Sequence, residues 1–247
     1  MTNFDDRPMG VSRVIDIHRS KFTFVTSVIL LVALIQQSTC KKRSMYDPDP
    51  PRVPRRSWAV KNAFERYRII LDRIIPKAPD RFMLVKFNNN KTVELGSVMR
   101  FDDVWEIPVF INFDFDIGCY HTLIFLNIDH QNEFFPQKRQ YLHWLVGNIP
   151  EVMLEKGKIL ASYLMPIPPP ILRGSQRLVF LAYRQPKITI QFSEPFIPAL
   201  PLPKTRTNWT LEEFVKKYKL IGPVAGNFYR IDWQTEVVRP KYDDGPK

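Results

Sequence analysis

The chain has 247 residues, of which 45% are hydrophobic and 13% aromatic, so it holds enough apolar material for a packed core and is not disordered throughout. Its two cysteines, Cys40 and Cys119, are too few for a disulfide framework or for a zinc site built from cysteine. The net charge of +11 is uneven, because residues 41–75 hold ten Lys and Arg against four Asp and Glu, whereas residues 101–150 hold two against seven. A basic segment of this kind contacts RNA, anionic lipid or an acidic protein surface, or it is a solvated linker.

The N-terminal residues 1–40 have the character of a targeting segment. An apolar run from Phe22 to Ile35 follows basic residues, and it is shorter than the roughly 20 apolar residues that span a bilayer. It fits a secretory signal or a signal anchor, and an unusual organelle address is the alternative. Residues 41–57 form a basic, proline-rich arm, residues 58–240 the expected domain, and residues 241–247 a tail.

A helix is predicted between residues 60 and 75, where apolar residues recur at helical spacing and Pro76 and Pro79 then end it. The chain then changes to short runs rich in β-branched and aromatic residues, which predict strands separated by turns. These runs are Phe82–Phe87, Ile107–Phe115, Thr122–Ile128, Tyr141–Ile149, Arg177–Tyr183 and Ile188–Phe192.

A second helix is predicted near residue 210, because Thr210 and Glu213 have the spacing of a capping box and an apolar stripe follows them. Several strands are apolar on both faces, as in strands buried between two layers. The sequence therefore predicts a mostly β domain of two packed sheets with peripheral helices.

Four blocks of sequence occur in an order that resembles the phosphatidylethanolamine-binding protein (PEBP) family. They are TLIFLNIDHQ, YLHWLVGNIP, PPPILRGSQRLVFLAYRQ and FVKKYKLIGPVAGNFYRIDW, and the resemblance covers about Ile70 to Trp233. The resemblance implies a PEBP-like sandwich of two antiparallel sheets with short peripheral helices. In detail the blocks are most similar to the PEBP-like protein of the mitochondrial large ribosomal subunit.

The resemblance also implies a small surface pocket for a phosphate or similar anion. The family's two acidic positions fall on Asn127 and Asp129, and its paired histidines fall on Leu142 and His143. The histidine before the motif's arginine falls on Gln176, the arginine is Arg177, and the late tyrosine is Tyr229. Because several of these groups are replaced, we expect a degenerate pocket of His143, Tyr229, Asn127 and Gln176 that is weak or closed.

Two further expectations concern single contacts in these blocks. His143 is either part of that pocket or a buried histidine bonded to a backbone carbonyl or to Tyr229. Asp129 and Arg177 come from otherwise apolar blocks, where an unpaired charge is costly, so we expect them to form a structural ion pair.

No constellation of an enzyme, a metal site or a cofactor site stands out in the sequence. The first hypothesis is therefore a non-enzymatic protein that resembles the mitochondrial ribosomal component and contacts rRNA and neighbouring ribosomal proteins. Its candidate RNA contacts are Lys41, Lys42, Arg43, Arg52, Arg55 and Arg56. The alternative is a secreted or membrane-anchored binder of a phospholipid headgroup or small anion, for which the sequons at Asn90 and Asn208 would accept glycans.

Overall fold

The computed structural model describes residues 57–88, 90–130, 140–168, 174–200, 204–207 and 209–233. The predicted targeting segment, the six candidate RNA contacts, the sequon residue Asn208 and the tail lie outside these residues. Within the described ranges, no helix is both long enough and apolar enough to cross a bilayer.

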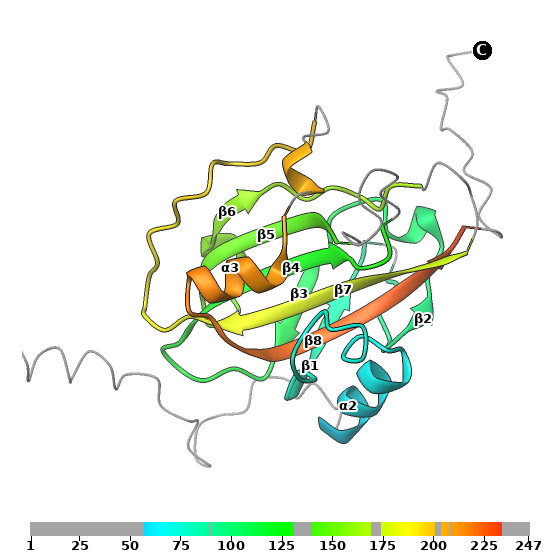
Figure 1. The fold of residues 1–247 in the computed structure, drawn as a ribbon, viewed down its shortest axis with the longest axis horizontal. Helices are drawn as coiled ribbons and strands as arrows, with labels where there is room; N and C mark the ends of the chain where they lie inside the picture. The colour runs from blue at the N-terminus through cyan, green and yellow to red at the C-terminus, as the bar shows by residue number, and fades with distance from the viewer. Residues whose placement is uncertain are drawn as a thin grey trace, which may run out of the picture. The chain divides into compact units, whose positions relative to one another are not determined.

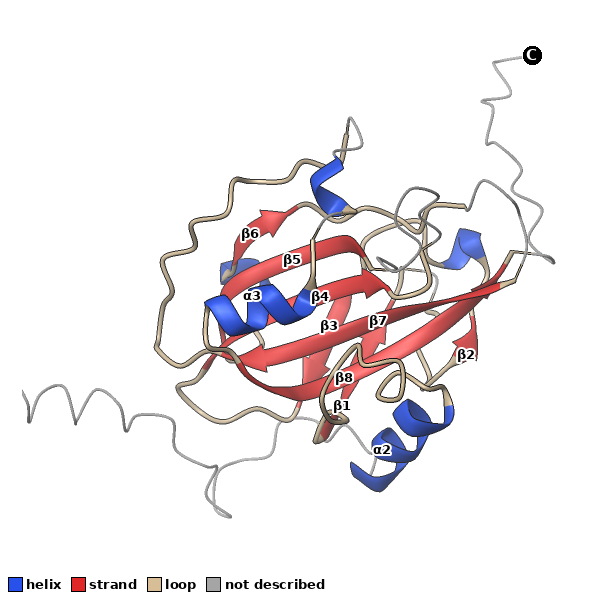
Figure 2. Ribbon diagram, viewed as in Figure 1, coloured by secondary structure: helices blue, strands red, loops and turns tan. Residues whose placement is uncertain are grey.

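The fold is built on a curled eight-stranded sheet in the order β3-β1-β8-β7-β4-β5-β6, with β2 also paired to β8 (Figures 1 and 2). The prediction of a mostly β domain is confirmed. The pairing is mixed, since β1 and β2 run parallel to β8 and the other pairs are antiparallel. The strands are β1 (Arg81–Lys86), β2 (Ser97–Val98), β3 (Phe110–Phe113), β4 (Tyr120–Asn127), β5 (Tyr141–Pro150), β6 (Lys158–Ala161), β7 (Ser175–Arg184) and β8 (Ile221–Asp232).

The family resemblance implies two antiparallel sheets, and in this structure all eight strands are joined in one continuous sheet. β1 makes the connection, because it pairs with β3 on one side and with β8 on the other. Gly226 in β8 permits this approach, since a Cβ there would lie 2.6 Å from Pro79 and 3.1 Å from the carbonyl oxygen of Phe180. Nothing in a linear pattern of strands indicates such a parallel pairing between distant segments.

Two hydrophobic clusters lie on opposite faces of the sheet, as alternation along β7 requires. On what we call the helix face, Tyr183 packs in a cluster with buried residues of α2 (Ser57–Arg66) and α3 (Leu211–Lys217). On what we call the loop face, Phe180 packs in a cluster with residues of the irregular segments around β2 and β6. Three short 3-10 helices complete the described structure: η1 (Phe101–Asp103), η2 (Leu154–Lys156) and η3 (Lys204–Arg206).

The first helix is shorter than the sequence predicts, because α2 ends at Arg66 and residues 67–77 form turns. Arg68 and Arg73 have φ angles of 61° and 56°, in the left-handed region that interrupts a helix. The carbonyl of Tyr67 accepts a hydrogen bond of 2.5 Å from Nη1 of Arg177 in place of a helical partner. The distant β7 strand therefore stabilises the end of this helix, which local periodicity does not reveal.

The predicted strand at Ile188–Phe192 is an extended loop that pairs with no strand. Its hydrogen bonds come from a side chain, because Asn148 Oδ1 accepts from the Ile190 amide at 2.8 Å and Nδ2 donates to the Ile190 carbonyl at 3.0 Å. The ring of Phe192 lies over Gly147, where a Cβ would be 2.3 Å from it. A side-chain amide and a glycine thus replace the partner strand.

The second predicted helix is present as α3, after Thr210. The predicted capping box is not formed, since the Thr210 side chain makes no cap hydrogen bond and its buried Oγ1 has no partner among the described residues. The predicted strand at Ile107–Phe115 is also shorter, and only β3 remains of it.

Candidate functional site

The positions that the resemblance assigns to a pocket come from four neighbouring strands. Asn127 ends β4, His143 lies in β5, Gln176 starts β7 and Tyr229 lies in β8. All four side chains are buried. Because β8, β7, β4 and β5 are adjacent in the sheet, the fold gathers these residues from 103 positions of sequence into one region (Figure 1).

A β-bulge in β5 sets the position of His143. Phe125 pairs with Trp144 and the next residue of β4 pairs with Leu142, so His143 is the extra residue between them. Its ring centroid lies 5.3 Å from that of Phe125 and 5.1 Å from that of Tyr141. Bulges of this kind re-aim a side chain, and this one turns an imidazole toward the aromatic residues of the loop face.

His143 is a neutral imidazole with one nitrogen unused. Nδ1 lies 2.9 Å from the carbonyl oxygen of Leu164, one of the two partners expected from the sequence, and a carbonyl can only accept, so Nδ1 carries the proton. Nε2 is then an acceptor, and it is buried without a partner in the described part of the chain. Burial lowers the pKa of His143 to about 3, and the nearby charge of Arg206 lowers it further against the opposing effect of the Leu164 carbonyl.

Gln176 leaves a hydrogen-bond donor unused beside the same strands. Its Oε1 accepts from Nδ2 of Asn127 at 3.0 Å and from Nε1 of Trp233 at 2.8 Å. Asn127 in turn accepts the backbone N–H of Asp129 at 2.8 Å. These bonds fix the orientation of the Gln176 amide, and its Nε2 is buried with no partner among the described residues.

Tyr229 supplies a third unused polar atom. Its side chain is fully buried, and its ring centroid lies 6.2 Å from those of Phe87 and Phe125. Burial raises the pKa of Tyr229 well above its usual value, so the hydroxyl keeps its proton. That hydroxyl has no hydrogen-bond partner within the described ranges.

The polar cluster of Asn127, His143, Gln176 and Tyr229 therefore offers one acceptor and two donors. A buried polar group without a partner destabilises a fold by about 1–3 kcal/mol, so three of them in one region call for an explanation. Nε2 of His143 accepts a hydrogen bond, whereas Nε2 of Gln176 and the Tyr229 hydroxyl donate. That set matches a ligand group with both oxygen acceptors and a hydroxyl, such as a protonated phosphate ester.

The structure places Asp129 and Arg177 in a two-pronged ion pair. Nε and Nη2 of Arg177 lie 2.7 and 2.6 Å from the two carboxylate oxygens of Asp129, and Nη2 also lies 2.8 Å from Asp72. Burial would raise the pKa of Asp72, but the hydrogen bond and charge of Arg177 outweigh it and lower that pKa. The pair ties the end of β4 to β7 and to the turns after α2, which is a structural role.

Arg206 is a residue that sequence reasoning missed. It is fully buried in η3, and its two terminal nitrogens donate to backbone carbonyls of Leu142, His143, Ser162 and Pro198 at 2.8–3.1 Å. In the described part of the chain it forms no ion pair, and burial lowers its pKa. Arg206 fixes the β5 backbone at His143 and adds positive potential there, but no motif marks it in the sequence.

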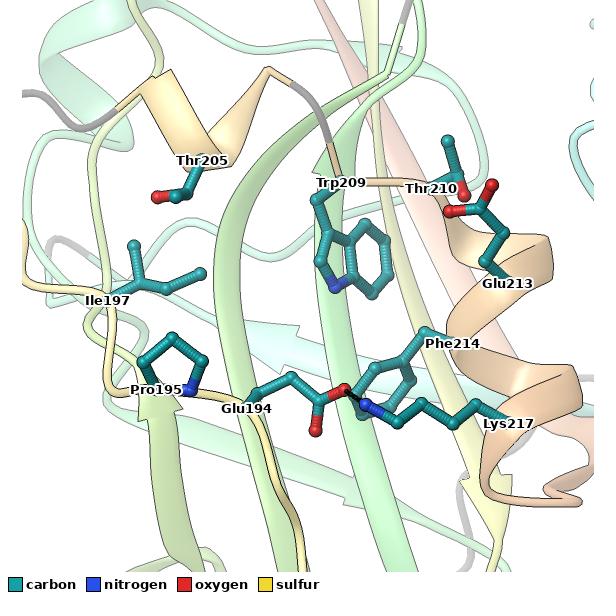
Figure 3. Close-up of a pocket in the computed structure, with 9 residues that line it drawn as sticks. All are labelled: Glu194, Pro195, Ile197, Thr205, Trp209, Thr210, Glu213, Phe214 and Lys217. Carbon is teal, nitrogen blue, oxygen red and sulfur yellow. Dashed lines mark hydrogen bonds and ion pairs between the residues drawn. The ribbon is translucent and has the colours of Figure 1, made fainter.

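A cavity of about 380 Å³ lies beside the start of α3, and Figure 3 shows its lining. Trp209 and Phe214 form an aromatic wall with ring centroids 5.5 Å apart. Glu194 and Lys217 lie across from each other and are joined by an ion pair of 2.6 Å, and Glu194 is also bonded to the hydroxyl of Tyr218. Glu194 and Lys217 therefore neutralise each other, and the remaining charged residue of the lining is Glu213.

The described residues hold no group of three or more His, Cys, Asp and Glu side chains that could bind a metal ion. Nδ1 of His121 lies 2.8 Å from the carbonyl oxygen of Glu151, and the ring of His130 packs at a tilt against Tyr141, with the ring centroids 4.6 Å apart. The candidate RNA contacts in the basic arm lie outside the described residues.

Comparison with solved structures identifies the fold. The chain is similar to a carboxypeptidase Y inhibitor crystallised with its cognate proteinase, with a TM-score of 0.59 and 20% identity over 71% of this chain and 96% of that one. It is also similar to a phosphatidylethanolamine-binding protein from Plasmodium vivax, with a TM-score of 0.54 and 17% identity over 70% and 96% of the two chains. The chain has the PEBP fold.

Sequence comparison adds two relatives, although no family model matches the chain. An odorant-binding protein, A5, of Drosophila melanogaster is 27% identical over 68% of this chain and 78% of its own length. A 26 kDa secreted antigen of Toxocara canis is 32% identical over 65% of this chain and 60% of its own length. Neither of these relatives nor the two PEBP-fold structures is a ribosomal protein.

Proposed function

We propose that the chain is a non-enzymatic PEBP-like binding protein of the secretory pathway, and that its polar cluster holds the head group of a lipid-like or other small oxygen-rich ligand. The observation that carries the proposal is the set of three buried polar atoms without a partner, on His143, Gln176 and Tyr229. They lie on the PEBP fold at the positions where the family resemblance implies a pocket.

The chemistry of the cluster favours a small anion that keeps one proton. His143 is neutral and accepts, Gln176 and Tyr229 donate, and Arg206 supplies positive potential without a carboxylate among the described residues to cancel it. A monoprotonated phosphate ester satisfies both kinds of group. Since the terminal donors of Arg206 are already used by carbonyls, we expect binding of about millimolar strength.

The proposed compartment is supported by the relatives and by the one described cysteine. Both relatives carry names of secreted or ligand-binding proteins, an odorant-binding protein and a secreted antigen. Cys119 is disulfide-bonded, and disulfides persist in oxidising compartments. The ribosomal hypothesis, with rRNA and ribosomal proteins as partners in the mitochondrion, has no support from these relatives.

The ligand test follows the Nε2 nitrogen of His143 by NMR as phosphoethanolamine is added to the full chain. We expect its chemical shift to move from that of a free acceptor nitrogen, and Tyr229→Phe to weaken the binding about fivefold by removing one donor. Tyr183→Phe is the matched control, because it removes the hydroxyl of a buried tyrosine on the opposite face. No shift at His143 up to tens of millimolar ligand, in protein shown to be folded, would refute the ligand proposal.

The compartment is tested separately in cells. Asn90 is exposed in a turn, so a secreted chain should carry a glycan that a glycosidase removes and that Asn90→Gln reduces, with Asn208→Gln as the companion variant. In a secreted chain we expect both cysteines to be oxidised, so alkylation before reduction should label neither thiol. A glycan-free chain with both thiols reactive, co-sedimenting with mitochondrial large ribosomal subunits, would favour the ribosomal hypothesis instead.

A further inference from the structure

A second cavity, of about 600 Å³, lies on the helix face between the turns after α2, helix α3, the end of β7 and the start of β8. Its walls are mostly apolar, and its size is in the range that holds a small organic ligand. We call it the helix-face cavity. Residues that line it include Ile70, Ile74, Pro76, Leu211 and Val215.

Two cations at this cavity have no ion-pair or hydrogen-bond partner among the described residues. Arg73 and Lys216 both line it and are exposed, and in the described part of the chain neither side chain forms an ion pair or a hydrogen bond. One carboxylate, that of Glu212, is also present. The lining therefore carries a net charge of +1. A fully hydrated inorganic ion would make no use of the apolar wall beside these charges.

A tyrosine on the same face supplies an independent observation. Tyr183 is 1% exposed, lines the same cavity, and its hydroxyl has no hydrogen-bond partner within the described ranges. A tyrosine buried in this way normally finds a partner for its hydroxyl. The cavity that Tyr183 lines offers space for a ligand beside it.

The wall that carries Arg73 is held in place before any ligand arrives. The Arg73 amide donates to the carbonyl of Ile70 at 2.9 Å, and the neighbouring Asp72 is bonded to Arg177 of β7 at 2.8 Å. A preformed wall lowers the entropy that binding would otherwise lose. The cavity is thus a shaped site and does not depend on a loop closing.

We propose that the helix-face cavity binds one single-chain amphiphile with an anionic head, separately from the polar cluster on the loop face. The hydrocarbon chain packs on Ile70, Ile74 and Val215, and Arg73 and Lys216 hold the head by charge-assisted hydrogen bonds. The Tyr183 hydroxyl donates to an oxygen of the ligand. A carboxylate and a phosphate monoester both have this chemistry.

The test is calorimetric titration of the full chain with four ligands that share one tail, each below its micelle concentration. They are dodecanoate, dodecyl phosphate, dodecanol and dodecyltrimethylammonium. We expect one site for at least one of the two anions, dodecanol about tenfold weaker and the cation weaker still, and the stronger anion identifies the head group. Equal affinity for dodecanol and both anions, or no binding of either anion, would overturn the proposal.

Reversing the charge of the two cations should produce a gain of affinity for the cationic ligand, which a misfolded variant could not show. The double variant Arg73→Glu with Lys216→Glu should lose about tenfold in anion affinity and bind dodecyltrimethylammonium more tightly than the wild type. Lys156→Glu with Lys158→Glu makes the same change in net charge at exposed positions outside the cavity lining and should alter neither the anion affinity nor the cation affinity.

Tyr183→Phe should weaken anion binding about fivefold, and Tyr229→Phe should leave it unchanged. An unchanged head-group preference in the charge-reversed variant, or a loss caused by Tyr229→Phe, would refute the assignment.

Discussion

The two faces of the sheet bury tyrosines in different surroundings, although the strands beneath are equally apolar. On the loop face, Tyr229 is enclosed by aromatic rings beside the neutral His143, and the polar atoms there lie deep inside the fold. On the helix face, Tyr183 lines a cavity whose other wall carries exposed cations. Long irregular segments cover the first face, and the elements around α3 cover the second incompletely. What covers a sheet, more than the sheet itself, decides which kind of ligand each face can take.

The largest expected effect is that of acid on the loop face, which holds the two most deeply buried histidines of the described chain. Burial lowers the pKa of His143 to about 3 and that of His121 to about 4, from 6.5. The unfolded chain binds these protons near pH 6.5 and the folded chain does not, so their contribution is complete above that pH and is lost as the pH falls toward 4. Each histidine should remove about 1.4 kcal/mol of stability per pH unit in this window.

Urea unfolding at pH 7 and pH 4.5 measures this effect, and the sum for the two histidines is about 5 kcal/mol. His130→Gln should reduce the pH dependence only in part, because His130 is less buried than the other two histidines, although burial lowers its pKa as well. The same free energy of unfolding at both pH values would mean that His143 and His121 are not buried as described.

The next effect concerns the ion pair of Asp129 and Arg177, which joins the segment after β4 to β7. Asp129→Asn removes one partner of Arg177 where both side chains are less than one-fifth exposed. Breaking such a pair should lower the free energy of unfolding by about 3 kcal/mol. Asp102→Asn makes the same change in an exposed pair with Arg100 and should cost less than about 1 kcal/mol. Equal losses from the two variants would show that Arg177 does not hold this region together.

The smallest expected effect is a difference in the free energy of unfolding between the variants Tyr229→Phe and Tyr183→Phe. Tyr229→Phe removes a fully buried hydroxyl that has no partner among the described residues, so we expect the unliganded protein to be unchanged or up to about 1 kcal/mol more stable. Tyr183→Phe should change stability by less than about 0.5 kcal/mol, because its hydroxyl is beside the cavity. Thermal or urea unfolding of both variants is the measurement, and a clear loss in Tyr229→Phe would reveal a partner inside the fold.

The sequence predicted those strands that local apolar patterns mark and those candidate residues that ordered motifs mark. The apolar runs indicated β4, β5 and β7 to within a few residues, and the family blocks named His143, Gln176 and Tyr229 as pocket positions, whose strands only the structure places near one another. The sequence did not predict the parallel pairing of β1 with β8, since that contact depends on how segments distant in the chain meet.

Single side chains with long-range partners account for most of the other differences. Arg177 ends α2 early by bonding the carbonyl of Tyr67, and Asn148 takes the place of a strand beside Ile190. Arg206 reaches from η3 to a carbonyl of β5 and to that of Ser162, just after β6, with no local signal in the sequence. The helix-face cavity also arises only in three dimensions, because its walls come from segments more than a hundred residues apart.

A reciprocal titration tests most directly the central claim that the sheet separates two binding sites. Wild-type protein, Tyr229→Phe and Tyr183→Phe are each titrated with phosphoethanolamine and with dodecanoate, one ligand in the presence and absence of the other. We predict that Tyr229→Phe weakens only phosphoethanolamine binding, that Tyr183→Phe weakens only dodecanoate binding, and that neither ligand displaces the other. Competition between the two ligands, or loss of both through one tyrosine, would contradict the account.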